Sequence, residues 1–378
     1  MKGIKQGGIK MTKQLGRKVI DQLTPYVPGK PIEDVKKEYG IKEVTRLASN
    51  ENAYGPSPKA IEAMKEAVHS SWLYPEPTCR SLREKLGALY GLSPEQFVTG
   101  NGADHLITLI AMAFINEGDE VVYSSPTFGS YRESTLMMGG NPVEVPLTED
   151  YVYNLDGILE KVTEKTKIVY VCNPNNPTGT ILQPSQIEDF LKNVPSHVLV
   201  VLDEAYVEFI KEESYRTGVD FIKDGHQLLT LRTFSKLYGL AGSRVGYVMG
   251  NENLLAPLQA VRPTFEVNRI AIAGAEATLD DLSHSEEVLQ KIHGEIARVK
   301  KEYTALGFDV LGEHANFIFV DIKEDVAELS EAFLKKGLIV RPCTPWGLMT
   351  HVRISIGTPE QNDLLIKSIK EIKNVEVV

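Results

Sequence analysis

The hydrophobic positions between residues 95 and 250 form short continuous runs rather than the alternating pattern of a half-buried strand. The runs are rich in β-branched residues, and stretches with helical spacing separate them. Strands covered by helices on both faces have this pattern, so we predict an α/β fold with a mostly parallel central sheet. Functional loops should gather at the carboxyl edge of that sheet. The predicted strands are 121–123, 167–172, 198–202, 228–231 and 245–249.

A different pattern begins after residue 280. Apolar residues recur every three or four positions from Leu289 to Leu306, which predicts one long amphipathic helix that Gly307 ends. This alternation of a helix with short strands indicates a second, smaller α+β domain. Its predicted strands are 317–320, 338–341 and 352–356, and its other predicted helices are 326–336 and one from Pro359.

The length of 378 residues also favours two packed units, because one hydrophobic core usually stops growing below this size. We predict an N-terminal arm with part of the small domain at 1–45, a large domain at 46–270 and the rest of the small domain at 271–378. Residues 1–10 are polar and precede a second methionine, so we expect them to be an extension rather than part of the fold.

Composition and charge narrow the class of protein. A net charge of -10 opposes non-specific binding to nucleic acid or to an anionic membrane, so any bound phosphate needs a local site. Three widely spaced cysteines fit no disulfide framework, and the eight histidines form no H-E-x-x-H or similar metal motif. No membrane span or signal peptide is predicted, and we expect a cytoplasmic enzyme without a metal.

Lys236 lies just after the strand at 228–231, in a segment rich in small residues. Partial burial and a nearby cation such as Arg244 lower the pKa of an amine, and the neutral amine attacks aldehydes. Arg244 is also a candidate phosphate ligand. A single lysine after a strand is more often a solvated surface residue, so this interpretation needs support from other motifs.

The strand at 198–202 ends in Asp203, and Tyr206 follows three residues later. A carboxylate at the end of a buried strand suits a cationic partner, such as a pyridinium nitrogen. It would raise the pKa of that nitrogen by roughly 1–3 units and keep the ring protonated as an electron sink. The alternative is that Asp203 only caps the next helix.

Two turns complete the set of candidates. The segment 172–179 has the Asn, Pro and Gly residues of an ordinary turn, but it also presents Asn176 as a donor to a ring oxygen of a ligand. Gly100 and Gly102 precede an apolar helix whose N-terminus can bind phosphate. The third glycine of a dinucleotide-binding fingerprint is absent, because His105 stands there.

Together these four motifs resemble the fold type I aminotransferases that use pyridoxal 5′-phosphate (PLP), and more closely the histidinol-phosphate aminotransferase family. The resemblance covers nearly the whole chain, from Leu23 to Ile369. It implies a seven-stranded, mostly parallel sheet in the large domain. Segments 23–26, 47–56, 74–75 and 352–357 also carry the likeness.

The resemblance implies a role for each matched residue. Lys236 would be the Schiff-base lysine and proton shuttle, Asp203 would pair with the pyridine nitrogen, and Asn176 and Tyr206 would hold the phenolic oxygen. Phe128 would stack on the ring, where many relatives have Tyr. The phosphate would be bound by Ala103 and Asp104 N–H groups, Ser235, Arg244 and, from the neighbouring subunit of a homodimer, Tyr54.

Arg353 matches the position that grips the substrate carboxylate and, in this family, the substrate phosphate. Tyr26 and Arg341 match family residues that would assist Arg353 in binding the substrate phosphate. Family members commonly have Pro at position 53 and Ser-Asp-Glu at 103–105, where this chain has Ala and Ala-Asp-His. The stretch 342–346 is also bulky: Trp346 either narrows the pocket, favours an aromatic side chain, or simply packs under the loop.

The predicted function is transamination between L-histidinol phosphate and 2-oxoglutarate in histidine biosynthesis. An aromatic amino acid aminotransferase is the near alternative, and a PLP-dependent decarboxylase of phosphorylated amino acids is a more distant one. A PLP-sensing regulator would need an added DNA-binding module, for which the chain has neither the length nor the basic charge.

Overall fold

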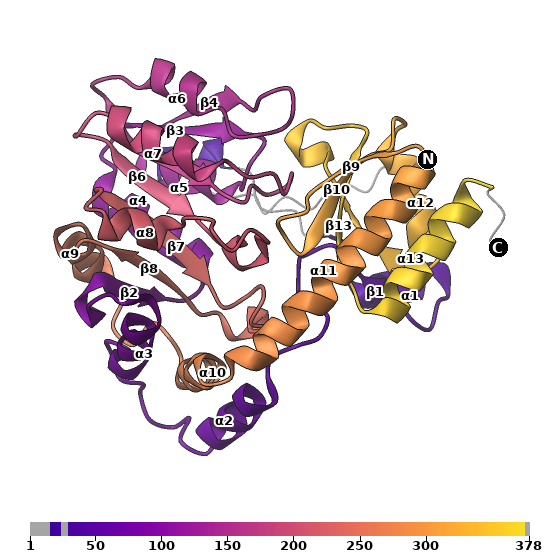
Figure 1. The fold of residues 1–378 in the computed structure, drawn as a ribbon, viewed down its shortest axis with the longest axis horizontal. Coiled ribbons are helices and arrows are strands. Elements are labelled where there is room, and N and C mark those ends of the chain that lie inside the picture. Colours follow the sequence, from indigo (N-terminus) through magenta and orange to yellow (C-terminus); the bar gives the residue numbers. More distant parts are fainter. Residues whose placement is uncertain (1–15, 24–28, 375–378) are drawn as a thin grey trace.

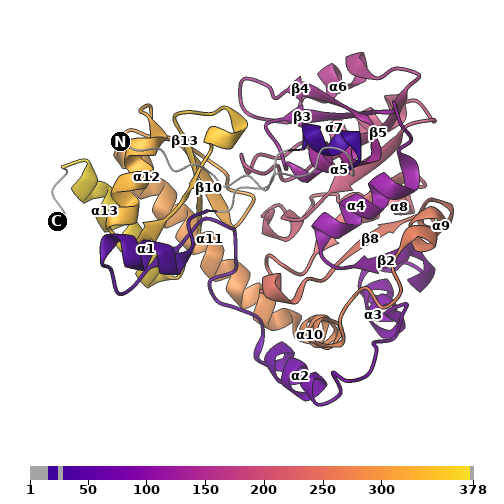
Figure 2. The ribbon, with the colours of Figure 1, turned by 180° about the vertical axis from the view of Figure 1, so that it is seen from behind.

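The computed structural model describes residues 16–23 and 29–374. A seven-stranded sheet forms the centre of the larger part, with helices on both faces (Figures 1 and 2). All of its strand pairs are parallel except those that involve β8, which runs antiparallel to both neighbours. The sheet order is β2 (Phe97–Gly100), β8 (Gly246–Gly250), β7 (Leu228–Thr233), β6 (Leu199–Asp203), β5 (Thr166–Cys172), β3 (Glu120–Ser125) and β4 (Asn141–Pro146).

The central strands are buried along their whole length, which explains their continuous apolar runs. Every residue of β6, β7 and β8 is buried, because helices cover both faces of the sheet. The predicted α/β fold with a mostly parallel sheet is therefore confirmed. The helices of this part are α2 (Pro58–Val68), α3 (Arg80–Tyr90), α4 (Ala103–Phe114), α5 (Ser130–Met138), α6 (Leu155–Lys161), α7 (Pro184–Asn193), α8 (Gly218–Lys223), α9 (Glu252–Val261) and α10 (Arg269–Leu279).

The smaller part is built on an antiparallel four-stranded sheet, and the predicted α+β arrangement is confirmed. Its order is β12 (Arg341–Pro342), β13 (His351–Ser355), β10 (Phe317–Asp321) and β9 (Asp309–Leu311). A parallel pair, β1 (Thr45–Arg46) with β11 (Leu338–Ile339), lies beside it. The helices are α1 (Ile32–Tyr39), α11 (Leu282–Ala305), α12 (Val326–Lys335) and α13 (Pro359–Ile372).

The long helix α11 extends from near α10 into the smaller part (Figure 1). Its buried face includes Ile292, Ile296, Val299 and Tyr303, as the apolar spacing predicted, and Gly307 follows its end with a positive φ of 85°. Short 3₁₀ turns complete the described elements: η1 (Lys18–Gln22), η2 (Pro94–Gln96), η3 (Val207–Phe209), η4 (Ala241–Ser243) and η5 (Thr344–Trp346). In the described ranges, no helix is both long and apolar enough to cross a membrane.

One predicted strand is wrong in detail. The apolar run 338–341 forms two strands rather than one: Leu338 and Ile339 pair with β1, whereas Arg341 and Pro342 pair with β13. The chain changes sheets at Val340, and single-sequence apolarity carries no information on strand partners. The domain limits 1–45, 46–270 and 271–378 stay a prediction, and residues 1–10 lie outside the described residues.

Candidate active site

The predicted cofactor residues come together at one edge of the large sheet. Asn176 follows β5, Asp203 ends β6 and Lys236 follows β7, while Phe128 follows β3 and Ala103 starts α4 just after β2. These strands share one direction, so their carboxyl ends meet at the same edge. Four separate sequence motifs thereby become one site.

Asp203 is almost fully buried, with 2% of its surface exposed. Its Oδ2 accepts a hydrogen bond from the Tyr131 hydroxyl at 2.6 Å, and its Oδ1 accepts one from the Ala205 N–H at 3.0 Å. Burial raises the pKa of the Asp203 carboxyl to about 6, although the hydrogen bond from Tyr131 opposes this rise. A carboxylate held in this way is suited to a cationic ring nitrogen, whose charge would offset the cost of its burial.

The raised pKa gives cofactor binding a predictable pH dependence. Below about pH 6 the Asp203 carboxyl is protonated, and it must lose that proton before it can pair with a pyridinium. PLP affinity for the apoprotein should therefore weaken about tenfold per unit as pH falls below that point. In Tyr131→Phe the midpoint should move to higher pH, because a hydrogen bond that lowers the pKa of Asp203 is lost. Fluorescence titration with PLP across a pH series measures both midpoints.

Tyr170→Phe is the matched control for this prediction. Tyr170 stacks on Tyr131 with ring centroids 4.3 Å apart, but its buried hydroxyl has no hydrogen-bond partner. Its removal should leave the midpoint where the unmodified protein has it. An identical midpoint in Tyr131→Phe and Tyr170→Phe would show that Tyr131 does not tune Asp203.

Lys236 is partly buried, and the next residue, Leu237, belongs to the hydrophobic core of the smaller part. The Lys236 Nζ is 3.4 Å from the Ser49 carbonyl oxygen and 5.4 Å from the centre of the Tyr206 ring. The Tyr206 hydroxyl accepts a hydrogen bond of 2.9 Å from the Asn50 amide. Asn50 has a positive φ of 56° and also hydrogen-bonds Ser355, so it fixes Tyr206 against the small domain.

The phosphate-binding candidates surround the N-terminus of α4. No side chain caps this helix, and its N-cap Gly102 has a φ of 83°. A Cβ at Gly102 would collide with the Arg244 guanidinium, so glycine permits the close approach. Arg244 Nη1 is 3.3 Å from the Ser235 hydroxyl. These groups offer backbone donors, a cation and a hydroxyl, which is the donor set that a phosphate needs.

Asp104 is exposed, and its carboxylate accepts a hydrogen bond from the Ser130 hydroxyl. This contact occupies the acidic side chain, while the backbone N–H of Asp104 belongs to the first turn of α4. The arrangement agrees with a phosphate site that uses Asp104 only through its backbone.

The two candidate substrate arginines stand directly opposite each other on β12 and β13. Arg353 is 6% exposed, and it donates to Asn176 Oδ1 at 2.5 Å and to the Ala48 carbonyl at 2.7 Å. This contact connects the substrate side of the site to the residue predicted to hold the phenolic oxygen. Arg341 is half-buried beside it. Tyr26 lies outside the described residues.

Within the described part of the chain, the buried hydroxyl of Tyr54 has no hydrogen-bond partner. Gly239, in the loop that follows Lys236, approaches the Gly55 backbone so closely that a side chain would not fit. The backbone next to Tyr54 therefore lies against the lysine loop. Together with the buried Asp203 and the Gly102 cradle, this unsatisfied donor fits the pattern of charges and acceptors on PLP.

Comparison with known proteins supports the resemblance to aminotransferases. The aminotransferase class I and II family matches residues 42–369. The histidinol-phosphate aminotransferase of Moorella thermoacetica is 42% identical over 94% of this chain and 92% of its own. A second, histidinol-phosphate aminotransferase 2 of Carboxydothermus hydrogenoformans, is 41% identical over 95% and 99%. This chain belongs to the histidinol-phosphate aminotransferase family.

A solved structure agrees with this family. Histidinol-phosphate aminotransferase from Sinorhizobium meliloti, crystallised in complex with PLP, superposes with a TM-score of 0.87 at 28% identity. The alignment covers 96% of this chain and 98% of that one. The fold type I arrangement of the aminotransferase is thus confirmed.

Some residues of the aminotransferase site were not predicted from sequence. Tyr131 supports Asp203, Asn50 supports Tyr206, and Glu266 accepts hydrogen bonds from the His105 ring and from the Asn101 N–H at 2.8 Å. Glu266 therefore fixes the phosphate loop from a segment more than 150 residues away. No local motif marks these supporting contacts, because each depends on tertiary packing.

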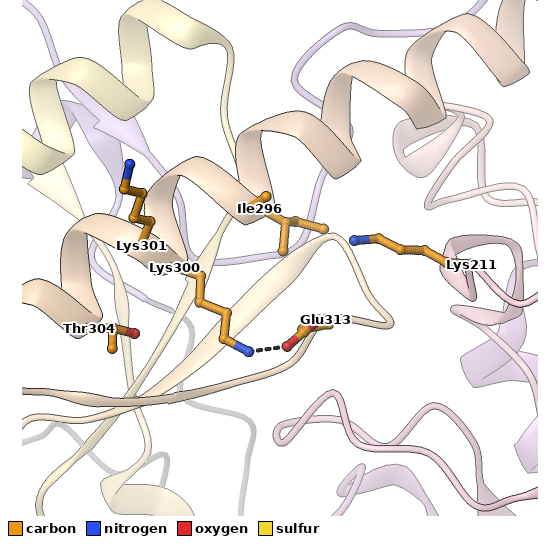
Figure 3. Close-up of a pocket in the computed structure, with 7 residues that line it drawn as sticks. Lys211, Ile296, Lys300, Lys301, Thr304 and Glu313 are labelled. Carbon is orange, nitrogen blue, oxygen red and sulfur yellow. Dashed lines mark hydrogen bonds and ion pairs between the residues drawn. The ribbon is translucent and has the colours of Figure 1, made fainter.

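A separate cavity of about 360 Å³ lies on α11, away from the predicted cofactor residues. Figure 3 shows Lys211, Lys300 and Lys301 around it, with Lys300 paired to Glu313. Of the predicted cofactor and substrate residues that the structure describes, none lines this cavity. The site of this aminotransferase is thus defined by converging polar groups rather than by cavity size.

Proposed function

We propose that this chain is a PLP-dependent transaminase that moves an amino group between L-histidinol phosphate and 2-oxoglutarate in histidine biosynthesis. The observation that carries the proposal is the opposed pair Arg341 and Arg353 beside the cofactor residues. One arginine suffices for the singly charged α-carboxylate of glutamate, whereas a doubly charged phosphate ester benefits from two cations. The names of the similar proteins support the same substrate.

Each residue has a chemical task in this proposal. PLP, when bound, supplies a cationic ring that withdraws electrons from the substrate carbon. Asp203 would keep the ring nitrogen protonated, since it is buried and Tyr131 holds it in place. Asn176 and Tyr206 would hold the phenolic oxygen. Lys236 Nζ would bond the cofactor and carry the proton that moves during transfer.

The same site must accept glutamate and the imidazole-bearing phosphate ester in turn. Arg353 would bind the carboxylate of the first and the phosphate of the second, and Arg341 would join only for the phosphate. Tyr26 is proposed as a further phosphate ligand. Because Arg353 contacts Asn176 at 2.5 Å, a bound anion also affects a cofactor ligand directly.

The test is a comparison of kcat/KM for L-histidinol phosphate and phenylalanine with 2-oxoglutarate as acceptor. The proposal expects histidinol phosphate to be preferred by at least about tenfold, the effect of one anion contact. A preference for phenylalanine would identify an aromatic aminotransferase. Release of carbon dioxide from a phosphorylated amino acid without keto acid formation would identify a decarboxylase.

We propose that the working unit is a homodimer with shared active sites. The Tyr54 hydroxyl has no hydrogen-bond partner among the described residues of its own chain, and Trp72, Tyr74 and Phe265 form an exposed aromatic surface. In that surface Tyr74 stacks on Phe265 at 4.4 Å, and Trp72 is 80% exposed. Contiguous exposed apolar surface of this kind is typical of protein interfaces. A cytoplasmic location is proposed on the three unpaired cysteines.

Shared sites predict complementation between two defective variants. Lys236→Ala removes the lysine of its own site, and Tyr54→Phe removes a phosphate donor from the partner's site. When the two proteins exchange subunits, each hybrid dimer should contain one intact site, giving about a quarter of the wild-type number of intact sites. The measurement is transaminase activity at limiting PLP before and after subunit exchange. Activity that stays at the weighted mean of the parents would contradict shared sites.

A further inference from the structure

Trp346 connects the substrate arginines to the cofactor loop. It ends η5, in the loop between Arg341 on β12 and Arg353 on β13. Its indole N–H donates a hydrogen bond of 2.8 Å to the Thr127 carbonyl oxygen, across the boundary between the small sheet and the large one. Thr127 is adjacent to Phe128, the predicted stacking residue. The indole is therefore fixed relative to the cofactor site.

The acceptor of this hydrogen bond is itself held in place. Thr127 is 4% exposed, and its hydroxyl donates to Asn175 Oδ1 at 2.8 Å. The Asn175 amide in turn donates to the Pro126 carbonyl at 3.2 Å and to Thr178 at 3.0 Å. This network ties the loop after β3 to the loop after β5. Trp346 thus rests on a rigid part of the large domain.

The indole ring lies beside both guanidinium groups. The Arg341 guanidinium carbon is 5.7 Å from the ring centre, and that of Arg353 is 5.9 Å from it. Arg353 also lies 5.4 Å from the ring of Phe317. Cation–π attraction at these distances favours holding two like charges close together. Two cations in a fixed relation to the cofactor loop form a receptor for a doubly charged anion.

We propose that Trp346 is a specificity-determining residue that positions Arg341 for the phosphate of the substrate. The inference rests on the proposed function, because the pair of arginines matters only for a substrate with a phosphate group. Arg353 has two further anchors, Asn176 and Ala48, so it keeps its place without the indole. Loss of the ring should consequently weaken phosphate substrates more than glutamate.

The test compares Trp346→Leu, which removes the ring, with Trp346→Phe, which keeps a ring but removes the N–H. In the leucine variant, the KM for L-histidinol phosphate should rise about fivefold to thirtyfold, the span of a partly desolvated cation–π contact. The KM for glutamate should rise less than about threefold, and kcat for both should change little. The phenylalanine variant should lie between wild type and leucine.

A binding experiment gives a readout apart from turnover. The chain has two tryptophans, so Trp72→Phe leaves Trp346 as the single indole fluorophore. Inorganic phosphate added to this PLP-loaded variant should change the Trp346 emission, and Arg341→Gln should raise the phosphate concentration needed. Trp72→Phe serves only as the background for this fluorescence titration. It is not used in the activity measurements, because Trp72 lies in the proposed dimer surface.

The results of these experiments distinguish failure of the Trp346 role from failure of the proposed function. Equal increases in KM for glutamate and histidinol phosphate, or no increase for either, would overturn the specificity role. If Trp346→Leu fails to fold, Trp346→Phe and the phosphate titration decide the matter. If the wild-type enzyme does not act on histidinol phosphate, the proposed function fails. Phosphate-dependent Trp346 emission would then still support an anion site, and its absence would overturn that as well.

Discussion

Lys236→Ala should lower the rate of transamination by at least about four orders of magnitude. The substitution removes the amine that bonds the cofactor and carries the proton, and no other lysine is hydrogen-bonded in the described site. The fold should persist, because Lys236 is only partly buried and its Nζ makes a long hydrogen bond of 3.4 Å to the Ser49 carbonyl oxygen. PLP should still bind without covalent attachment, through the protein groups proposed to hold its phosphate. Steady-state rates and the visible absorbance of bound PLP measure both effects.

Lys165→Ala is the control for this variant. Lys165 is exposed at the opposite edge of the sheet, just before β5, so its removal should leave the rate and the spectrum unchanged. Retention of more than about one percent of the wild-type rate in Lys236→Ala would be inconsistent with its assignment as proton carrier.

Asp203→Asn should weaken both PLP binding and turnover, each by about 10-fold to 1000-fold. A nearby carboxylate raises the pKa of a pyridinium by roughly 1–3 units, and each unit corresponds to a tenfold change in equilibrium. The amide keeps the size of the side chain but cannot supply the negative charge. Because burial raises the pKa of the Asp203 carboxyl to about 6, the variant should also lose the pH dependence of PLP affinity near that value. PLP titration and kcat measure the two effects.

Asp189→Asn provides a matched substitution on the exposed surface of α7, and it should behave like wild type. A second useful comparison is thermal stability without PLP. Burying the charged form of Asp203 is unfavourable, so above about pH 6 the apo variant should be at least as stable as wild type. If Asp203→Asn binds PLP as tightly as wild type at neutral pH, Asp203 is not the partner of the ring nitrogen.

The central α/β fold could be predicted because burial leaves a direct trace in the sequence. The apolar runs at 167–172 and 198–202 became β5 and β6, and the spacing along 289–306 gave the buried face of α11. Strand partners leave no such trace. The segment 338–341 therefore had to be seen in space before it divided between two sheets.

The candidate site divides in a similar way. The residues proposed to contact the cofactor stand at or just after strand ends, so Lys236, Asp203 and Asn176 could be named from the sequence. The residues that hold them could not, because Tyr131 and Asn50 act across 72 and 156 positions of the chain. For Trp346 the sequence left three roles open, and its hydrogen bond to Thr127 and its place beside Arg341 support a different one, the proposed positioning of that arginine.

The most direct test of the whole account is a visible absorbance spectrum of the PLP-loaded protein, titrated with glutamate and then, in a separate sample, with L-histidinol phosphate. The account predicts that both compounds abolish the band of PLP bonded to the lysine, that 2-oxoglutarate restores it, and that Lys236→Ala, which can hold PLP only non-covalently, lacks this band from the start. A band that histidinol phosphate leaves unchanged but phenylalanine abolishes would contradict the proposed substrate.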